Sequence, residues 1–304
     1  NQEQPFLPIY NFAVITDSVE GLVLVDINTL ADGEFRNNFL KRFVTWNPAG
    51  KLTGARYLTI AGNLAYVVTG SQVVVADLST PSVPKIVAEI PFDSPRSVAL
   101  QFRYLFVTTA RGFEVVDITT PSRPRKLPEA TVPLANAGGF TVARTYAYVA
   151  NGREGMAIID VKRPHAARLF QKWNADGGLS DSRDVMIAST NASLFAYVAD
   201  GKGGLKVVQL TSPSSQPNFY GFSPEPRPEL IAYKATRSAA LSLSRPLERD
   251  RAVDESGGQV AVFGRRGSRP FNLQEMQRLY LDKDGEPWYV EDNPAVKQAQ
   301  RNSR

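Results

Sequence analysis

The chain contains no cysteine and only one histidine among its 304 residues. The absence of cysteine excludes disulfides, thiolate metal sites, cysteine nucleophiles and covalent haem attachment through a CxxCH motif. One histidine cannot build a zinc site by itself, and no carboxylate cluster lies near it in the sequence. We therefore expect this chain to hold no metal ion and no cofactor of its own.

Long apolar runs and basic clusters are also lacking. No apolar run approaches the roughly 18 residues of a membrane helix, so we expect no transmembrane segment. The net charge is +5, but the lysines and arginines are spread along the chain, which argues against a nucleic-acid partner. The chain begins at Asn1 without methionine or an apolar leader, so we expect a processed or truncated product that has lost an export signal.

What the sequence does contain is one phrase written five times: an apolar run, a polar residue and a turn, as in GFEVVDITTPSRP from residue 112. The polar residues of the five copies are spaced 51, 40, 43 and 49 residues apart; they are Asp26, Asp77, Asp117, Asp160 and Gln209. A period of about 40 to 50 residues with strand-like content is typical of the four-stranded blades of a β-propeller.

A whole blade can be read in the third unit. We predict an innermost strand at 96–102, a second at 104–110, a third at 113–118 and an edge strand at 125–132. The second and third strands of all units are apolar on both faces, as expected for strands packed between neighbouring blades. The sequence therefore predicts an all-β propeller of about six blades, with seven as the alternative.

The terminal units are less regular. The innermost strand of the first unit would come from 4–10, where two prolines weaken it, from a segment upstream of the chain, or from the C-terminal tail. A degenerate sixth unit is predicted at 237–244 and 249–264. We predict a propeller over residues 1–270 and a tail over 271–304, with a short helix and strand, which packs on the propeller or on a partner.

Copies such as GLVLVDI, GFEVVDI and GMAIIDV, each followed by a polar turn, resemble the LVIVD-repeat family of bacterial and archaeal propellers. The resemblance covers roughly residues 10 to 264. It implies a propeller fold and an extracytoplasmic location, because members of this mostly uncharacterised family are usually exported or attached to the cell surface. Some members look like companions of multihaem cytochromes, so the resemblance suggests such a cytochrome as the partner.

Arginine recurs where the innermost strands begin. Aligned units place Arg56, Arg96, Gly138, Arg183 and Arg237 in one slot, with a gap at the glycine. If these arginines converge at the channel mouth, they could bind an anion or a partner, since guanidinium donates paired hydrogen bonds to carboxylate or phosphate. The alternative is structural: each arginine pairs with an acid of the neighbouring blade, since Asp17, Asp200 and Glu154, together with the amide of Asn151, lie on adjoining turns.

Two further side chains carry hypotheses. His165 is expected in an exposed loop; the sharper alternative is a partner contact in which it donates an axial haem ligand. The repeated Asp precedes a turn in each unit, so we expect it to accept hydrogen bonds from that turn rather than to bind metal. The DKDGE stretch from residue 282 resembles the start of a calcium loop but lacks its final glutamate, so we expect a turn.

These observations favour a non-catalytic, extracytoplasmic scaffold that binds another protein. The alternative is a propeller enzyme, a hydrolase or lyase that acts on an anionic substrate at an arginine-lined mouth. For that enzyme the best acids are Asp181 and Asp184, which flank Arg183. A third and weaker alternative is adhesion to an anionic surface.

Overall fold

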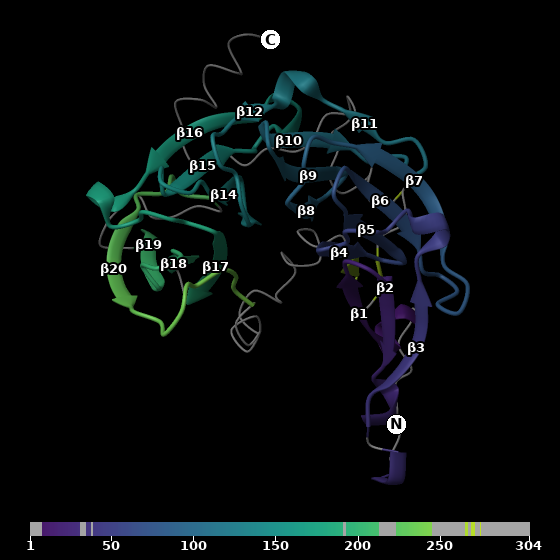
Figure 1. Cartoon of the computed structure of the whole chain (residues 1–304). Coiled ribbons are helices and arrows are strands. Elements are labelled where there is room, and N and C mark those ends of the chain that lie inside the picture. The colour runs from purple at the N-terminus through teal and green to yellow at the C-terminus, as the bar shows by residue number, and fades with distance from the viewer. Residues whose placement is uncertain are drawn as a thin grey trace.

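The structure is a computed structural model that describes residues 8–30, 35–37, 39–190, 193–212 and 223–244, together with 265, 266, 269, 270 and 274. Five antiparallel sheets follow one another around an arc, from the purple sheet at the N-terminal end to the green sheet β17–β20 (Figure 1). Each sheet is a propeller blade, which we number 1 to 5 along the chain. The prediction of an all-β propeller is therefore confirmed.

The strand order within each blade follows the chain. Blade 1 comprises β1 (Phe12–Asp17), β2 (Gly21–Asp26) and β3 (Lys41–Trp46). Blade 2 comprises β4 (Tyr57–Ala61), β5 (Leu64–Val68), β6 (Gln72–Asp77) and β7 (Lys85–Pro91). Blade 3 comprises β8 (Ser97–Gln101), β9 (Tyr104–Thr109), β10 (Gly112–Asp117), β11 (Arg125–Lys126) and β12 (Val132–Pro133). Blade 4 comprises β13 (Phe140–Ala143), β14 (Tyr146–Ala150), β15 (Met156–Asp160) and β16 (Arg168–Trp173). Blade 5 comprises β17 (Asp184–Thr190), β18 (Ser193–Ala199), β19 (Leu205–Thr211) and β20 (Glu229–Lys234).

The innermost strands line the inside of the arc, where β4 contacts β8, β8 contacts β13, and β13 contacts β17. The outermost strands β3, β7, β16 and β20 form the outer rim (Figure 1). Four apolar clusters fill the spaces between successive blades, so the molecule has one core for each pair of neighbours. This explains the doubly apolar strands: in β5 and β6, alternate side chains belong to clusters on opposite faces of blade 2.

Two strand predictions need correction. The edge strand predicted at 125–132 is split into β11 and β12 by a 3-10 turn, η5 (Pro128–Ala130). Pro128 causes the break because it lacks an N–H for the ladder, and the turn instead buries Leu127 and Ala130. In blade 1, the described part of the predicted innermost strand is also a 3-10 turn, η1 (Pro8–Asn11), so the described blade 1 begins at the second strand.

The sixth unit is described only in its first part. Residues 237–244 form no strand there, and Ala240 makes an isolated bridge to Gly201 of blade 5. The rest of that unit at 249–264, and the predicted tail apart from Gln274, lie outside the described residues. A short pair of strands, β21 (Arg265–Arg266) and β22 (Arg269–Pro270), completes the described chain. In this described part, no helix is long and apolar enough to cross a membrane.

Candidate functional site at the blade entrances

Four residues occupy equivalent positions at the start of the innermost strands. The backbone N–H of each donates to the carbonyl that ends or nearly ends its blade's second strand: Arg56 to Val68 (3.0 Å), Arg96 to Thr108 (2.7 Å), Gly138 to Ala150 (2.7 Å) and Arg183 to Ala199 (2.8 Å). This shared hydrogen bond fixes the register of four blades. It agrees with the alignment of these four positions in the sequence.

The fifth aligned position was wrong. The bridge between Gly152 and Ser182 has its counterpart one blade later in the bridge between Gly201 and Ala240. Since Ser182 directly precedes Arg183, the residue that matches Arg183 is Leu241. Arg237 lies four residues earlier, in an exposed segment, and is not brought to the same position as the other arginines.

The side chains of Arg56 and Arg96 join one blade to the next. Arg56 donates to the carbonyl of Pro95 at 2.8 Å and to Thr69 at 3.2 Å. Arg96 repeats this contact one blade later, donating to the carbonyl of Ala137 at 2.7 Å. The carbonyls of Pro95 and Ala137 each belong to the residue just before the next entrance position. These two arginines therefore fasten neighbouring blades, although through backbone carbonyls rather than through the acids that we expected.

A glycine turn makes the same connection in the later blades. Gly152 donates its backbone N–H to the carbonyl of Ser182 at 3.0 Å, and Gly201 donates to Ala240 at 3.0 Å. Ser182 and Ala240 precede their entrance positions as Pro95 and Ala137 do. The carbonyl bound by an arginine side chain in the earlier joints is thus bound by a backbone amide in the later ones, and no arginine is required there.

The side chain of Arg183 therefore does not bind the residue before the next entrance position. Its guanidinium pairs with Asp181 in the same loop, with Nε to Oδ1 at 2.8 Å and Nη2 to Oδ2 at 3.0 Å. The Arg183 side chain is 49% exposed. The described side-chain contacts of Arg183 therefore do not join one blade to the next, although its backbone carbonyl accepts from the N–H of Gly139 in blade 4 at 2.9 Å.

The acids and amide proposed as arginine partners serve their own loops. Asp17 accepts from the backbone N–H groups of Val19 and Glu20, and these hydrogen bonds lower its pKa. Buried Asp200 accepts from the loop that leads into blade 5. Asn151 accepts from the N–H of Asn136 in the loop that leads into blade 4. Glu154 pairs with Lys172, which lowers the pKa of Glu154.

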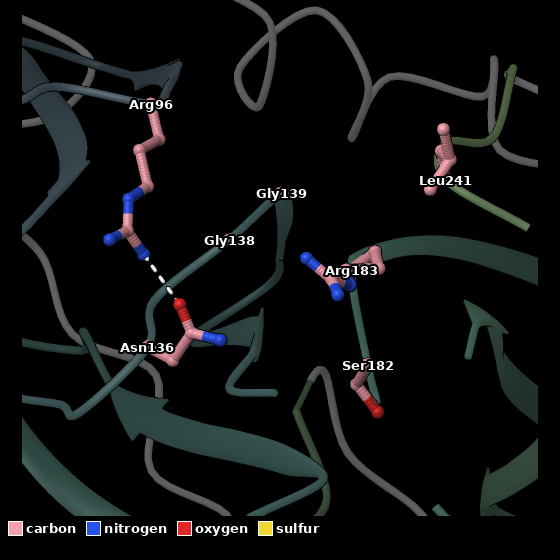
Figure 2. A pocket seen from close by; sticks show the side chains of 7 residues that line it. All are labelled: Arg96, Asn136, Gly138, Gly139, Ser182, Arg183 and Leu241. Carbon is pink, nitrogen blue, oxygen red and sulfur yellow. Dashed lines mark hydrogen bonds between the residues drawn. The ribbon is translucent and has the colours of Figure 1, made fainter. Parts of the chain in front are cut away.

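A pocket of about 450 Å³ opens where the entrance arginine is missing from blade 4. It is lined by Arg96, Asn136, Gly138, Gly139, Ser182, Arg183 and Leu241. Figure 2 shows the guanidinium groups of Arg96 and Arg183 on opposite sides of the Gly138–Gly139 segment. The glycines bring this segment against blade 5: a Cβ on Gly138 would lie 2.6 Å from the carbonyl oxygen of Arg183. No signal beyond the missing arginine pointed to this pocket in the sequence.

Asp184, next to Arg183, is a buried acid beside this pocket. Burial raises its pKa, although its carboxylate accepts hydrogen bonds from the backbone N–H groups of Val185 (2.9 Å) and Leu243 (2.9 Å). Its side chain lies so close to Gly139 that only glycine fits there. Among the described residues, no group of three or more histidine, aspartate or glutamate side chains is placed to hold a metal ion.

Comparison with known sequence families finds one repeat in four parts of the chain. The LVIVD repeat matches four stretches, at residues 54–90, 94–126, 136–167 and 192–222, one for each of blades 2 to 5. The predicted resemblance to the LVIVD-repeat propellers is thus confirmed for these four blades. No curated protein matches it.

Solved structures agree with this fold. A Lactobacillus plantarum protein shares 14% identity with this chain at a TM-score of 0.57, over 76% of this chain and 70% of that one. The Cps50 (Swd1) β-propeller domain of Myceliophteria thermophila shares 12% identity at a TM-score of 0.51, over 74% and 69%. The chain spans 55% of the computationally designed Ika8 protein, at 13% identity and a TM-score of 0.46. At such identities the first two likenesses show the fold alone.

The repeated aspartate of the LVIVD motif has the expected structural role. In blades 1 to 4 its Oδ1 accepts the backbone N–H two residues later, at distances from 2.8 to 3.0 Å; the donors are Asn28, Ser79, Thr119 and Lys162. For Asp117, burial raises the pKa, but the hydrogen bonds from Thr119 together with Arg103 and Arg125 leave the pKa lowered. In blade 5, Gln209 replaces the aspartate and donates to the hydroxyl of Ser212 at 2.8 Å.

His165 lies between the third strand and the outermost strand of blade 4. It belongs to η6 (Pro164–Ala166), the short 3-10 turn that leads into the outermost strand β16. Its side chain is half-buried rather than fully exposed. The DKDGE stretch lies outside the described residues.

Proposed function

We propose that this propeller is a non-catalytic scaffold that binds another protein through its outer rim, in an extracytoplasmic compartment. The observation that carries the proposal is the exposure of large apolar side chains on or beside the outermost strands. These are Phe39, Leu40 and Phe43 in blade 1, Leu169 and Phe170 in blade 4, and Ile231 and Tyr233 in blade 5. Clusters of exposed apolar side chains on a water-soluble protein commonly mark protein contacts.

Blade 4 offers the best-defined contact. Phe170 is 39% exposed and rests edge-on against the ring of Tyr146, with the centroids 5.3 Å apart. Leu169, 41% exposed, is its neighbour on β16. Aromatic side chains held in one orientation lose little entropy when a partner covers them, which suits them as anchors. We therefore place the centre of the interface at Leu169 and Phe170.

The first partner to test is a multihaem c-type cytochrome. Support for this choice is the family resemblance, because some LVIVD-repeat propellers look like companions of such cytochromes. His165 precedes β16 by only a few residues, so a partner seated on Leu169 and Phe170 would come near this imidazole. The extracytoplasmic location rests on the same resemblance.

The experiment is a mild native purification from the source organism, with mass spectrometry and a visible spectrum of what accompanies the chain. We expect a second polypeptide, with a haem Soret band if it is a cytochrome. A double change, Leu169→Ser and Phe170→Ser, should weaken capture of that polypeptide roughly tenfold or more. Val83→Ser is the matched control, since Val83 is 59% exposed at the rim of blade 2.

A colourless second polypeptide would contradict the cytochrome assignment while leaving the scaffold intact. A chain that purifies alone, or capture unaffected by the double change, would contradict the rim proposal itself.

A second candidate function is a hydrolase or lyase at the entrance positions. The observation in its favour is Asp184, a buried acid of raised pKa that directly follows Arg183 in the chain. Acids of raised pKa next to cationic groups are typical of general acid–base sites. Turnover of anionic esters or uronates that is abolished by Asp184→Asn, in a variant that still melts as the wild type does, would establish it. Absence of turnover across such a panel would contradict it.

A further inference from the structure

We propose that the pocket between Arg96 and Arg183 binds a carboxylate that carries an aliphatic group. This inference concerns the channel-mouth side of blades 3 to 5. It does not depend on the rim interface proposed above.

Arg96 supplies the first donor group. One nitrogen, Nη1, is held by the Oδ1 atom of Asn136 at 2.9 Å and by the carbonyl of Ala137 at 2.7 Å. These bonds fix the guanidinium plane, and the dashed line in Figure 2 shows the first of them. Both acceptors are uncharged, and among the described residues no carboxylate forms an ion pair with Arg96. Its positive charge therefore remains available to a ligand at the pocket wall, already oriented.

Arg183 supplies the second donor group from the opposite wall. Asp181 occupies Nε and Nη2, which leaves Nη1 for a ligand. The glycine turn at Gly201 explains why this side chain can face the pocket: the carbonyl of Ala240, to which an arginine here would otherwise reach, is already bound. The blade joint thus stays closed without Arg183.

The floor of the pocket is backbone. Gly138 and Gly139, which lie between Arg96 and Arg183 in Figure 2, contribute no side chain to this space. A volume of about 450 Å³ falls within the range of small-molecule sites. Guanidinium groups that face each other across such a space suit an anion whose oxygens accept from both.

The surroundings select a singly charged ligand with an apolar part. Asp181 and Asp184 flank Arg183, so a dianion such as phosphate meets more repulsion than a monocarboxylate does. Leu241, 66% exposed, also lines the pocket and offers an apolar contact. A carboxylate with a short aliphatic chain satisfies both walls. It can come from a free organic acid or from the C-terminal carboxylate of a polypeptide that ends in an aliphatic residue.

The test is isothermal titration calorimetry of the full chain with 4-methylpentanoate, its neutral amide, inorganic phosphate, acetyl-Gly-Leu and acetyl-Gly-Leu amide. We expect at least one acid to bind roughly tenfold or more tightly than its own amide, because the amide loses the charge-assisted hydrogen bonds. Phosphate should bind more weakly than that acid. Whether 4-methylpentanoate or acetyl-Gly-Leu binds more tightly identifies the source.

Arg183→Met should weaken binding of that acid roughly tenfold. The separate variant Leu241→Glu should also weaken it, because it places a negative charge at the edge of the pocket. Arg168→Met is the matched control: Arg168 also pairs with an aspartate, Asp160, at 3.0 Å, but on the outer strand β16. Thermal melting verifies that each variant folds. Equal binding of acid and amide, no binding of either acid, or full affinity in folded Arg183→Met would each overturn the proposal.

Discussion

Replacing Arg96 with methionine tests whether the entrance arginines fasten the blades. Methionine keeps the length of the apolar stem but removes the guanidinium, so the buried carbonyl of Ala137 loses the donor that lies 2.7 Å away. A hydrogen bond from a charged donor contributes about 1.5–3 kcal/mol, and the half-buried position of Arg96 favours the lower part of that range. We expect a loss of about 2 kcal/mol in the free energy of unfolding, or roughly 4–8 °C in melting temperature.

The same substitution at the equivalent position two blades later is the control. Arg183→Met removes only an exposed ion pair with Asp181, while the blade joint is held by Gly201 and Ala240. Its cost should be about 0.5 kcal/mol. Urea unfolding followed by circular dichroism measures both variants, and Arg96→Lys should recover part of the loss because it restores a charged donor. Equal costs for the two methionine variants would refute the assignment of different roles to these arginines.

Two further changes probe other features. Gly112→Ala should lower the free energy of unfolding by roughly 3 kcal/mol, because φ is +127° and the new Cβ would lie 2.2 Å from the carbonyl oxygen of Val132. Gly177→Ala, with φ +93° and open space around the new Cβ, should lower it by about 1 kcal/mol. Similar melting temperatures for the two variants would contradict this difference. Burial raises the pKa of Asp184, so the folded state of the wild type loses stability as the pH rises from about 4 through that raised pKa. The stability of Asp184→Asn relative to wild type should therefore increase over this interval and then level off; a difference that does not change with pH in urea titrations would rule out a raised pKa.

The regular parts of the fold could be predicted from the sequence because each strand carries its own signal. The strands β5, β9 and β14 are β-branched or aromatic and apolar on both faces, and only a position between two blades accepts such a strand. The turn that follows the repeated aspartate was predictable for the same reason, since donor and acceptor are two residues apart. Local patterns of this kind can be recognised without knowledge of the tertiary structure.

The roles of the arginines could not be predicted because they depend on competition for one acceptor. Sequence alignment gives Arg96 and Arg183 the same position, but only the structure shows that the carbonyl reached by one is already bound in the joint of the other. Arg237 was aligned wrongly because the connection between blades 4 and 5 differs in length from the connection that follows blade 5. The correct alignment of that second connection is shown by the bridge between Gly201 and Ala240. Pro128 itself indicates a break in the strand, but the apolar residues around it favoured the prediction of a continuous strand.

The two kinds of joint leave different traces in amide hydrogen exchange. Gly152 and Ser182 exchange both backbone hydrogen bonds at 3.0 Å, and Gly201 and Ala240 do the same at 3.0 and 2.8 Å. The amides of Gly152 and Ser182 report on the opening between blades 4 and 5, and those of Gly201 and Ala240 on the release of the segment at 237–244 from blade 5, since a hydrogen-bonded amide exchanges with solvent when its bond opens. At the arginine joints the donor is a side chain, so no amide proton is shared between the blades there. Opening of the contact between Arg56 and Pro95, which joins blades 2 and 3, therefore leaves no such direct signal in an amide of the contact itself.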